Sequence, residues 1–591
     1  MRHWYLFIPG LALVMVLVSL NGVLGTPRGL RTPEPLSETT LVESPPEVDL
    51  PADPVSCPGL ADLLRPRISR IASRAVRFRS QESRRIYKDL RRFYENREYE
   101  PAWILGSGEF PMAANLLEKI RRGTEHGLNP EHYPVAEIES TLGRQSETDP
   151  SALVETDIIL SHLFLTFASH LSRGRVNPKE LETPWHLKRE SKDLAAALEE
   201  GLATADIEQV LDDLAPKTTA YLALGQALQK LREESAEGWP QVGDTLATNR
   251  GFSLHEVSRY LKAVGDLPLG PDPVSLHRDS VLIEGVRVFQ TRQGLDPDGI
   301  IGPMTLAEMQ ISVKQRVQTL IVNMERHRWI PEDMGSHVLV NVPKFELEVR
   351  NGETAAMKMQ VITGTKRTPT PVFADQIEFM EINPQWHVPR SIATEEILPK
   401  ILEDPGYLTA KNFTVLDVST GMVIHPDSVT WAEVDSSNSS YRFRQEPGGG
   451  NPLGAIKFLF PNPFSVYLHD TSNPQLFDRT ERAFSHGCVR IEKPMSFAEF
   501  LMQEDTKWSR EQIETVAQSG KRRWVKLPSP VPVYLVYLTA GIEAEGKIGF
   551  RRDIYGRDAT LADALNEYRS PYQTPPPPPE PDQELANSGI E

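Results

Sequence analysis

A cysteine near the C-terminal end of the chain is framed by histidines in a pattern suited to thiol chemistry. Two short segments carry the pattern: Tyr467-Leu468-His469-Asp470 and Ser485-His486-Gly487-Cys488-Val489-Arg490. A thiolate is the strongest nucleophile among protein side chains, and a nearby imidazole is the usual group that generates and steers it. The pattern therefore predicts acyl transfer through a thioester, with Cys488 as the nucleophile.

The elements around these residues are predicted to be two neighbouring strands. His469 follows the apolar run 466–468, and Cys488 follows a glycine turn that leads into a second apolar segment. Adjacent strand ends bring an imidazole and a thiol within hydrogen-bond reach, and pairing with imidazolium lowers a thiol pKa from about 8.5 by several units. Gly487 permits close backbone approach, so that the N–H groups of Gly487 and Cys488 can face a developing oxyanion. The alternative is a buried structural cysteine with polar strand histidines, which the clustering of these residue types disfavours.

The composition excludes several classes of protein. The chain has 591 residues with 81 acidic and 64 basic side chains and a net charge of −17, which argues against general nucleic-acid binding. No Walker loop, His-Glu-x-x-His or Cys-x-x-Cys sequence is present, so neither a metal nor a phosphate-bearing cofactor is expected. Of the two cysteines, Cys57 is interpreted as a free residue, because a bridge to Cys488 would consume the candidate nucleophile.

The N-terminus has the features of an export signal. Arg2 and His3 precede an uncharged apolar stretch at about 4–24, so residues 1–25 are predicted to be a signal peptide or a membrane anchor. Cleavage would leave a soluble periplasmic protein, whereas retention would anchor it to the inner membrane. Both alternatives place the remaining chain outside the cytoplasm. Residues 26–65, rich in Pro, Ser, Glu and Thr, are predicted to be a disordered tether.

Changes of hydrophobic period divide the rest of the chain and predict a multidomain α+β protein. Helical spacing of apolar residues predicts a helical domain, a small helical unit and a connecting helix, whereas alternation predicts a β-rich domain. The predicted boundaries are 66–250 for the helical domain, 251–312 for the small unit, 313–335 for the connecting helix, 336–526 for the β-rich domain, 527–569 for a C-terminal extension and 570–591 for a Pro-rich disordered tail. No chemistry is predicted for the extension.

An insertion at about 384–450 interrupts the β-rich domain. A helical stretch at 391–402 is followed by a polar run that ends in three glycines. A long insertion beside a catalytic core is typically a lid or a substrate-recognition element, and the alternative is a disordered surface loop. Trp386, Trp431 and Tyr441 favour an ordered surface.

The small unit carries a characteristic pattern in Phe289-Gln290, Gly294-Leu295, Asp298-Gly299 and Gly302-Pro303-Met304-Thr305. In this pattern it resembles the three-helix peptidoglycan-binding domain. The resemblance implies that the small unit binds the cell wall. Because the pattern mostly encodes a turn and a core, the alternative is a module that keeps the fold without binding.

The cysteine segment is similar to the L,D-transpeptidase signature, in which a histidine and a spacer precede Ser/Thr-His-Gly-Cys. The large subfamily has a helical scaffold, a peptidoglycan-binding domain and a catalytic domain with a capping insertion. Further matches to it are Thr370-Pro371, Asn383-Pro384, Trp386, Gly127-Leu128-Asn129-Pro130 and Gly174-Arg175-Val176-Asn177-Pro178. The resemblance covers roughly residues 66–560. Arg490 stands where many members have asparagine.

The resemblance implies a role for each residue of the pattern. Cys488 is the nucleophile, and His469 is the base that forms an ion pair with it, oriented by the backbone carbonyl of Asp470. The supporting roles are shaping of the site by Ser485 and His486, an oxyanion site made by Gly487, Cys488 and Tyr467, and a substrate contact by Arg490. No metal or organic cofactor is implied.

The implied substrate is a peptidoglycan tetrapeptide stem. Cys488 attacks the carbonyl of the third residue, D-alanine leaves, and the side-chain amine of a neighbouring diaminopimelate attacks the acyl-enzyme to form a direct cross-link. Other wall-synthesis enzymes are candidate partners, and carbapenems are expected to acylate Cys488. Two alternatives remain open. One is an L,D-carboxypeptidase or cysteine peptidase with water as the acceptor, and the other is a non-catalytic wall-binding protein.

Overall fold

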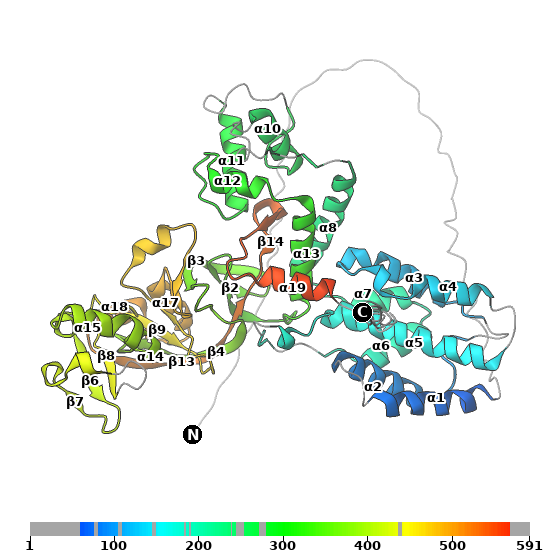
Figure 1. The fold of residues 1–591 in the computed structure, drawn as a ribbon, viewed down its shortest axis with the longest axis horizontal. Helices are drawn as coiled ribbons and strands as arrows, with labels where there is room; N and C mark the ends of the chain where they lie inside the picture. Colours follow the sequence, from blue (N-terminus) through cyan, green and yellow to red (C-terminus); the bar gives the residue numbers. More distant parts are fainter. Residues whose placement is uncertain are drawn as a thin grey trace, which may run out of the picture. The chain divides into compact units, whose positions relative to one another are not determined.

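The structure is a computed structural model. It describes residues 59–75, 81–104, 109–144, 149–181, 185–187, 191–237, 239–240, 242–243, 253–270, 279–434 and 440–567. The predicted export segment, most of the predicted tether, Cys57 and the Pro-rich tail lie outside these residues. The described residues form a multidomain α+β protein, as predicted (Figure 1).

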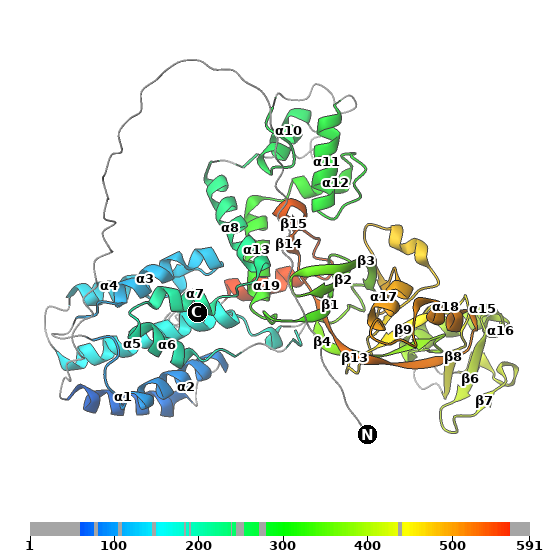
Figure 2. The same cartoon turned by 180° about the vertical axis from the view of Figure 1, so that it is seen from behind.

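The N-terminal part is a helical domain built around α5 (Pro150–Arg173). Its other helices are α1 (Leu60–Ala75), α2 (Gln81–Asn96), α3 (Ala113–Arg121), α4 (Val135–Arg144), α6 (Leu194–Ala203), α7 (Ile207–Leu214) and α8 (Thr219–Glu237). Helices α1 and α2 lie on one side of α5, and α3 and α4 lie on the other (Figures 1 and 2). Helix α5 is also long and apolar enough to cross a membrane, but most of it is buried within this domain. Its apolar surface is therefore that of a core helix.

The small unit consists of α10 (Leu254–Ala263), α11 (Ser280–Arg292) and α12 (Pro303–Met309). Phe289 is fully buried in its core. The amide of Gln290 donates to Asp298 Oδ1 at 2.8 Å and accepts the Gly299 N–H at 2.8 Å. The Phe-Gln pair thus joins the core of the unit to its glycine turn, which explains why the pattern predicts this fold.

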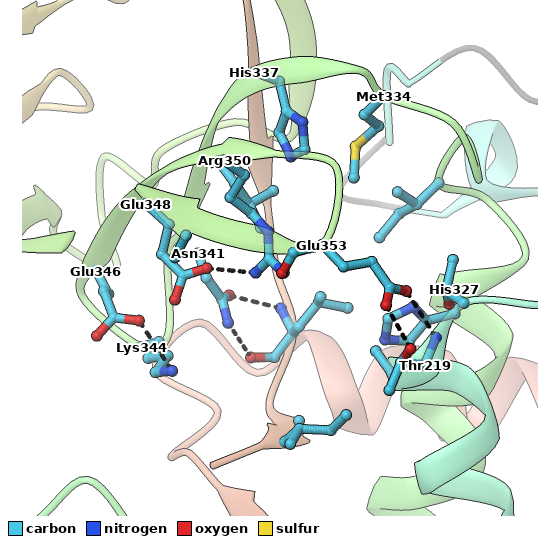
Figure 3. Close-up of a pocket in the computed structure, with 18 of the residues that line it drawn as sticks. Thr219, His327, Met334, His337, Asn341, Lys344, Glu346, Glu348, Arg350 and Glu353 are labelled. Atoms are coloured by element: carbon cyan, nitrogen blue, oxygen red, sulfur yellow. Dashed lines mark hydrogen bonds and ion pairs between the residues drawn. The ribbon is translucent and has the colours of Figure 1, made fainter. Parts of the chain in front are cut away.

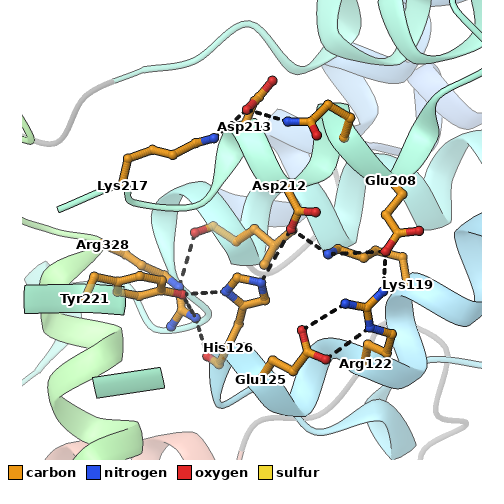
Figure 4. A network of polar contacts seen from close by, with 12 residues as sticks. Lys119, Arg122, Glu125, His126, Glu208, Asp212, Asp213, Lys217, Tyr221 and Arg328 are labelled. Atoms are coloured by element: carbon orange, nitrogen blue, oxygen red, sulfur yellow. Dashed lines mark hydrogen bonds and ion pairs between the residues drawn. The ribbon is translucent and has the colours of Figure 1, made fainter. Parts of the chain in front are cut away.

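Helix α13 (Val313–His327) connects the helical domain to the β-rich domain. It begins with a capping box between Ser312 and Gln315, which satisfies free N–H groups of the first turn. Near its end, buried Arg328 donates to the carbonyl of Leu171 and to the hydroxyl of Tyr221 in the helical domain. Figure 4 shows Arg328 and Tyr221 within a wider set of ion pairs and hydrogen bonds. On the β-rich side, the Arg326 guanidinium pairs with Asp558 of α19 (Arg557–Asn566) at 2.6 Å.

The β-rich domain contains a nine-stranded sheet in the order β11-β3-β12-β10-β9-β4-β13-β1-β2. The strands are β1 (Ser336–Asn341), β2 (Glu346–Asn351), β3 (Thr354–Gly364), β4 (Phe373–Ile382), β9 (Ile456–Leu459), β10 (Leu468–His469), β11 (Ala483–Ser485), β12 (Val489–Ile491) and β13 (Arg523–Val536). The sheet closes on itself because β2 also pairs with β3. Helices α17 (Pro494–Leu501) and α18 (Arg510–Gln518) pack against its apolar core.

Strand β13 differs from the predicted domain boundary. It crosses residue 526, where the β-rich domain was expected to end, and it lies between β4 and β1. The reason is local: Pro528 and Pro530 fall where the pairing with β4 shifts register, between Lys526 and Val531. Proline cannot donate to a ladder and is tolerated at such irregularities, so the proline-rich sequence conceals a continuous strand. A hairpin, β14 (Ala540–Ile542) and β15 (Ile548–Phe550), follows.

The insertion is an ordered unit with its own core. Strands β5 (Trp386–His387), β6 (Phe413–Asp417), β7 (Val423–Ile424) and β8 (Tyr441–Gln445) form a sheet in the order β5-β8-β6-β7. Its helical part consists of α14 (Arg390–Ile392), the π-helical turn η4 (Ala393–Ile397), α15 (Leu398–Glu403) and α16 (Tyr407–Ala410). Ile397, Ile401 and Val415 are buried between these elements. The predicted helical stretch is present, and the polar run after it includes three of the four strands.

Candidate active site

Strands β10 and β12 hold the cysteine and the histidine on one face of the sheet. The two strands are parallel neighbours in which Leu468 pairs with Val489 and His469 pairs with Arg490. Leu468 and Val489 are fully buried in the core of the sheet. Since side chains alternate along a strand, Tyr467, His469, Cys488 and Arg490 project from the opposite face. Two adjacent strand ends therefore bring the predicted residues together.

The Cys488 thiol is free and half-buried, and it lies against Tyr467. Its sulfur is 3.7 Å from the carbonyl oxygen of Ser465. Burial raises the pKa of the Cys488 thiol, while hydrogen bonds from Tyr467 work in the opposite direction. Burial and the neighbouring thiol also raise the pKa of the Tyr467 hydroxyl. Tyr467 therefore stays protonated and can donate a hydrogen bond beside the sulfur.

The His469 imidazole is buried and has its Nδ1 engaged. The Nδ1–H donates to the carbonyl oxygen of Asp470 at 2.6 Å, which leaves Nε2 with its lone pair. The Asp470 carboxylate accepts the N–H groups of Ala455 and Thr471, both at 2.7 Å, and so fixes this carbonyl. A Cβ at Gly454 would collide with the same carboxylate, a packing constraint that the sequence pattern did not reveal.

Burial disfavours the charged forms of both the thiol and the imidazole, so these shifts favour a neutral pair over the ion pair that the resemblance implies. Burial lowers the pKa of His469 to about 3, and the positive charge of Arg490 contributes in the same direction. The raised pKa of Cys488 favours the protonated thiol. The lowered pKa of His469 favours an imidazole whose Nε2 keeps its lone pair.

The pH dependence of thiol alkylation distinguishes these two states. In the free protein, alkylation of Cys488 by iodoacetamide is expected to rise steadily through about pH 8.5 and above, because the raised thiol pKa postpones thiolate formation. An imidazolium–thiolate pair would instead give a plateau of fast alkylation at neutral pH. The measurement is the alkylation rate by mass from about pH 5 to about pH 10. A flat, fast rate below neutrality would contradict a neutral pair.

The turn before Cys488 is organised by Ser485. Its buried hydroxyl accepts the Gly487 N–H at 3.1 Å and donates to the carbonyl oxygen of Cys488. The Gly487 N–H is thus occupied, contrary to the expectation that it would face an oxyanion. Within the described part of the chain, the Cys488 N–H has no acceptor. The backbone donor available for an oxyanion is therefore the Cys488 N–H.

His486 lies on the rim of the site and contacts the insertion. Its Nε2 is 2.9 Å from Glu396 Oε1 in the π-helical turn η4. Arg367 and Glu395 form a second contact to the same turn at 2.8 Å. His486 therefore links the turn before Cys488 to the insertion, whereas His469 is the histidine that shares a face of the sheet with Cys488. Single π-helical turns are frequent at functional sites.

Two cations flank His469 on the neighbouring strands. Arg490 on β12 lies opposite His469 in the strand register, and Lys457 on β9 lies opposite His469 on its other side. Arg490 is half-buried, and its Nε has no hydrogen-bond partner in the described residues. Lys457 is paired with Glu381 at 2.8 Å. This arrangement suits a ligand that carries a carboxylate next to the reacting carbonyl.

A separate cavity of about 710 Å³ lies away from the thiol, between α8, α13, β1, β2 and the β14–β15 hairpin (Figure 3). None of the residues that line it belongs to the turn before Cys488. Its charged walls are internally balanced, with Lys344 next to Glu346 and Arg350 next to Glu348. The candidate nucleophile Cys488 therefore lies outside this cavity. Among the described residues, no group of three His, Cys, Asp or Glu side chains lies together as metal ligands would.

Comparison with known proteins gives a consistent result for all three parts. Residues 88–228 match the family model described as "Scaffold domain", 251–309 the one described as "Putative peptidoglycan binding domain", and 335–517 the one described as "L,D-transpeptidase catalytic domain". A protein of Haemophilus influenzae (strain ATCC 51907 / DSM 11121 / KW20 / Rd) described as "Putative L,D-transpeptidase" is 38% identical over 244 residues. That stretch is 41% of this chain and 49% of the Haemophilus protein, so it spans about half of that relative's length.

Proposed function

We propose that this chain, an L,D-transpeptidase by its catalytic domain and its three-part architecture, cross-links peptidoglycan stem peptides through a thioester on Cys488. The observation that carries the proposal is the shared face of β10 and β12. This face carries the free Cys488 thiol with Tyr467 against it, and the His469 imidazole with its Nδ1 engaged by the Asp470 carbonyl. The Cys488 N–H has no acceptor in the described residues. These are the parts that nucleophilic acyl transfer requires.

In the first step, the donor is a tetrapeptide stem. As the Cys488 sulfur attacks the carbonyl of the third residue, His469 Nε2 takes the thiol proton. The Cys488 N–H and the Tyr467 hydroxyl stabilise the oxyanion. The imidazolium then returns its proton to the departing nitrogen, and D-alanine leaves. The burial that lowers the pKa of His469 favours the return of this proton to the departing nitrogen.

In the second step, an amine replaces D-alanine. The side-chain amine of a neighbouring diaminopimelate attacks the thioester carbonyl, His469 takes the amine proton, and the proton returns to the Cys488 sulfur as the new amide forms. Arg490 and Lys457 provide the positive charge that a stem carboxylate needs beside the reacting carbonyl. Water as the acceptor gives a carboxypeptidase, which uses the same residues and differs only in product.

The product assay separates the candidate functions. Purified protein is incubated with tetrapeptide muropeptides, and the products are identified by mass. Cross-linked dimers support transfer, tripeptides alone support hydrolysis, and unchanged substrate rules out catalysis.

The small unit with α11 is proposed to bind the cell wall during this reaction. The chain is further proposed to be exported to the periplasm through residues 4–24, with other wall-synthesis enzymes as candidate partners.

The insertion is proposed to be a lid over the site. Glu396→Ala, which removes the contact with His486, is expected to raise the alkylation rate of Cys488 by up to about fivefold, because partly exposed ion pairs contribute about 1 kcal/mol or less. Alkylation with a bulky maleimide, followed by mass, measures the effect. Glu403→Ala, on an exposed position of the same insertion, is the matched control and is expected to behave as the wild type. An unchanged or slower rate for Glu396→Ala would count against a lid.

A further inference from the structure

We infer that Tyr555 and Thr370 position the Gly487–Cys488 peptide so that the Cys488 N–H faces the reacting carbonyl. This inference rests on the proposed function, because it assigns a role in the same acyl transfer. Tyr555 belongs to the C-terminal extension, for which the sequence predicted no chemistry. Neither residue touches the thiol, so both are positioning residues.

The first link is the peptide unit itself. A peptide group is planar, and its C=O and N–H point in opposite directions, so whatever holds the Gly487 oxygen also aims the Cys488 hydrogen. The Thr370 hydroxyl donates to the Gly487 carbonyl oxygen at 2.9 Å. Gly487 has a φ of +112°, in a region open to glycine, and glycine leaves neighbouring peptides free to rotate. An external hydrogen bond is therefore what fixes this plane.

A second hydrogen bond to Thr370 determines which group its hydroxyl donates to. Thr370 is fully buried, and its oxygen accepts the Gly364 N–H at 2.9 Å. Its own hydrogen is thus left for the Gly487 carbonyl. The segments also approach each other too closely for a side chain, because a Cβ on Gly364 would lie 3.1 Å from the Gly487 Cα and would overlap the Thr368 carbonyl.

The third link is Tyr555, which holds the Thr370 segment from behind. Its hydroxyl donates to the Gly364 carbonyl at 2.6 Å and accepts the Thr370 N–H at 3.2 Å. The Tyr555 ring stacks on Tyr537 with centroids 5.5 Å apart, and the Tyr555 N–H donates to the Tyr537 hydroxyl at 3.0 Å. The Arg557 guanidinium lies over both rings and donates to the Thr370 carbonyl at 3.2 Å. The extension is therefore a fixed support for the catalytic turn.

The expected effect of losing this support is a loss of oxyanion stabilisation. Removal of one oxyanion donor typically lowers the rate by about 100-fold to 1,000-fold, and a donor that is present but free to rotate is expected to cost about tenfold or more. Alkylation by iodoacetamide forms no oxyanion, so it is expected to depend little on the direction of the Cys488 N–H. The two reactions together distinguish a positioning role from general damage to the site.

The experiment compares Thr370→Val, which removes only the hydroxyl at nearly constant shape, with Thr370→Ser, which retains it. Acylation of Cys488 by a carbapenem and alkylation by iodoacetamide are both followed by mass. We expect acylation to slow about tenfold or more in Thr370→Val, alkylation to stay within about twofold, and Thr370→Ser to recover most of the acylation rate. If Thr370→Val does not fold, Tyr555→Phe takes its place in the experiment. It is expected to show slower acylation and nearly unchanged alkylation.

Two results would overturn the inference. One is acylation of Thr370→Val and Tyr555→Phe at the wild-type rate, and the other is a parallel loss of acylation and alkylation. Tyr534→Phe, whose ring contacts His337 on β1, is the control for removal of a tyrosine hydroxyl from the same domain. Different measurements test the positioning role and the proposed function. Wild-type protein that forms the carbapenem adduct but no muropeptide dimers contradicts the function while leaving the Thr370 test intact.

Discussion

Replacement of Cys488 by alanine is expected to reduce the formation of cross-linked muropeptides by about 10,000-fold or more. The thiol is the group that would form the covalent intermediate, and loss of a nucleophile in comparable acyl-transfer enzymes has effects of this size. The stability of the protein is expected to change by about 1 kcal/mol or less, because Cys488 is small and half-buried. Product masses and thermal unfolding measure the two effects.

The second cysteine provides a matched control for this variant. Cys57→Ala leaves Cys488 as the one thiol of the chain. It is expected to cross-link and to form a single carbapenem adduct as the wild type does. Activity that persists in Cys488→Ala and disappears in Cys57→Ala would reverse the assignment of the nucleophile.

Replacement of His469 by glutamine is expected to lower the rate of transfer by about 100-fold to 10,000-fold, the usual range for a general base. A glutamine amide is polar and has no basic nitrogen, so the change removes the base. The residual rate is expected to rise with pH, because only molecules with an ionised thiol can then react. Rates of product formation measured across the pH range test both points.

His486→Gln is the comparison that separates the two histidines. Because His486 faces Glu396 in the insertion, its replacement is expected to change the rate by less than about tenfold. A larger loss in His486→Gln than in His469→Gln would show that the wrong histidine has been assigned as the base.

The wild type is expected to keep its activity well below pH 6.5, since His469 stays unprotonated down to about pH 3.

The placement of Cys488 and His469 on neighbouring strands could be predicted because it depends on strand alternation and adjacency, which short patterns encode. The occupation of the Gly487 N–H by Ser485 depends on the geometry of a single turn, which residue types alone do not determine. The lowered pKa of His469 results from burial and from the charge of Arg490, and both arise only when the strands are assembled. The sequence therefore indicates the participants and leaves their protonation open.

The insertion and the C-terminal extension show two further limits. Phe413 and Val415 alternate with Thr414 in β6, a strand signal that the surrounding polar residues obscured. Tyr555 contacts Gly364, which lies far away in the chain, so no local period could have indicated its position beneath the catalytic turn. Long-range hydrogen bonds of this kind become visible only in three dimensions.

The position of β13 bears on when the thiol becomes reactive during biosynthesis. This strand is almost the last to be made, yet it pairs with β1, whose partner residues are about 200 positions earlier in the chain. Until β13 emerges, β1 and β4 each lack a neighbour, and the closed sheet that carries β10 and β12 is incomplete. A nascent chain therefore contains Cys488 well before it contains an active site. Under the proposed export of an unfolded chain, this order of assembly delays the proposed acylating activity until β13 has crossed the membrane.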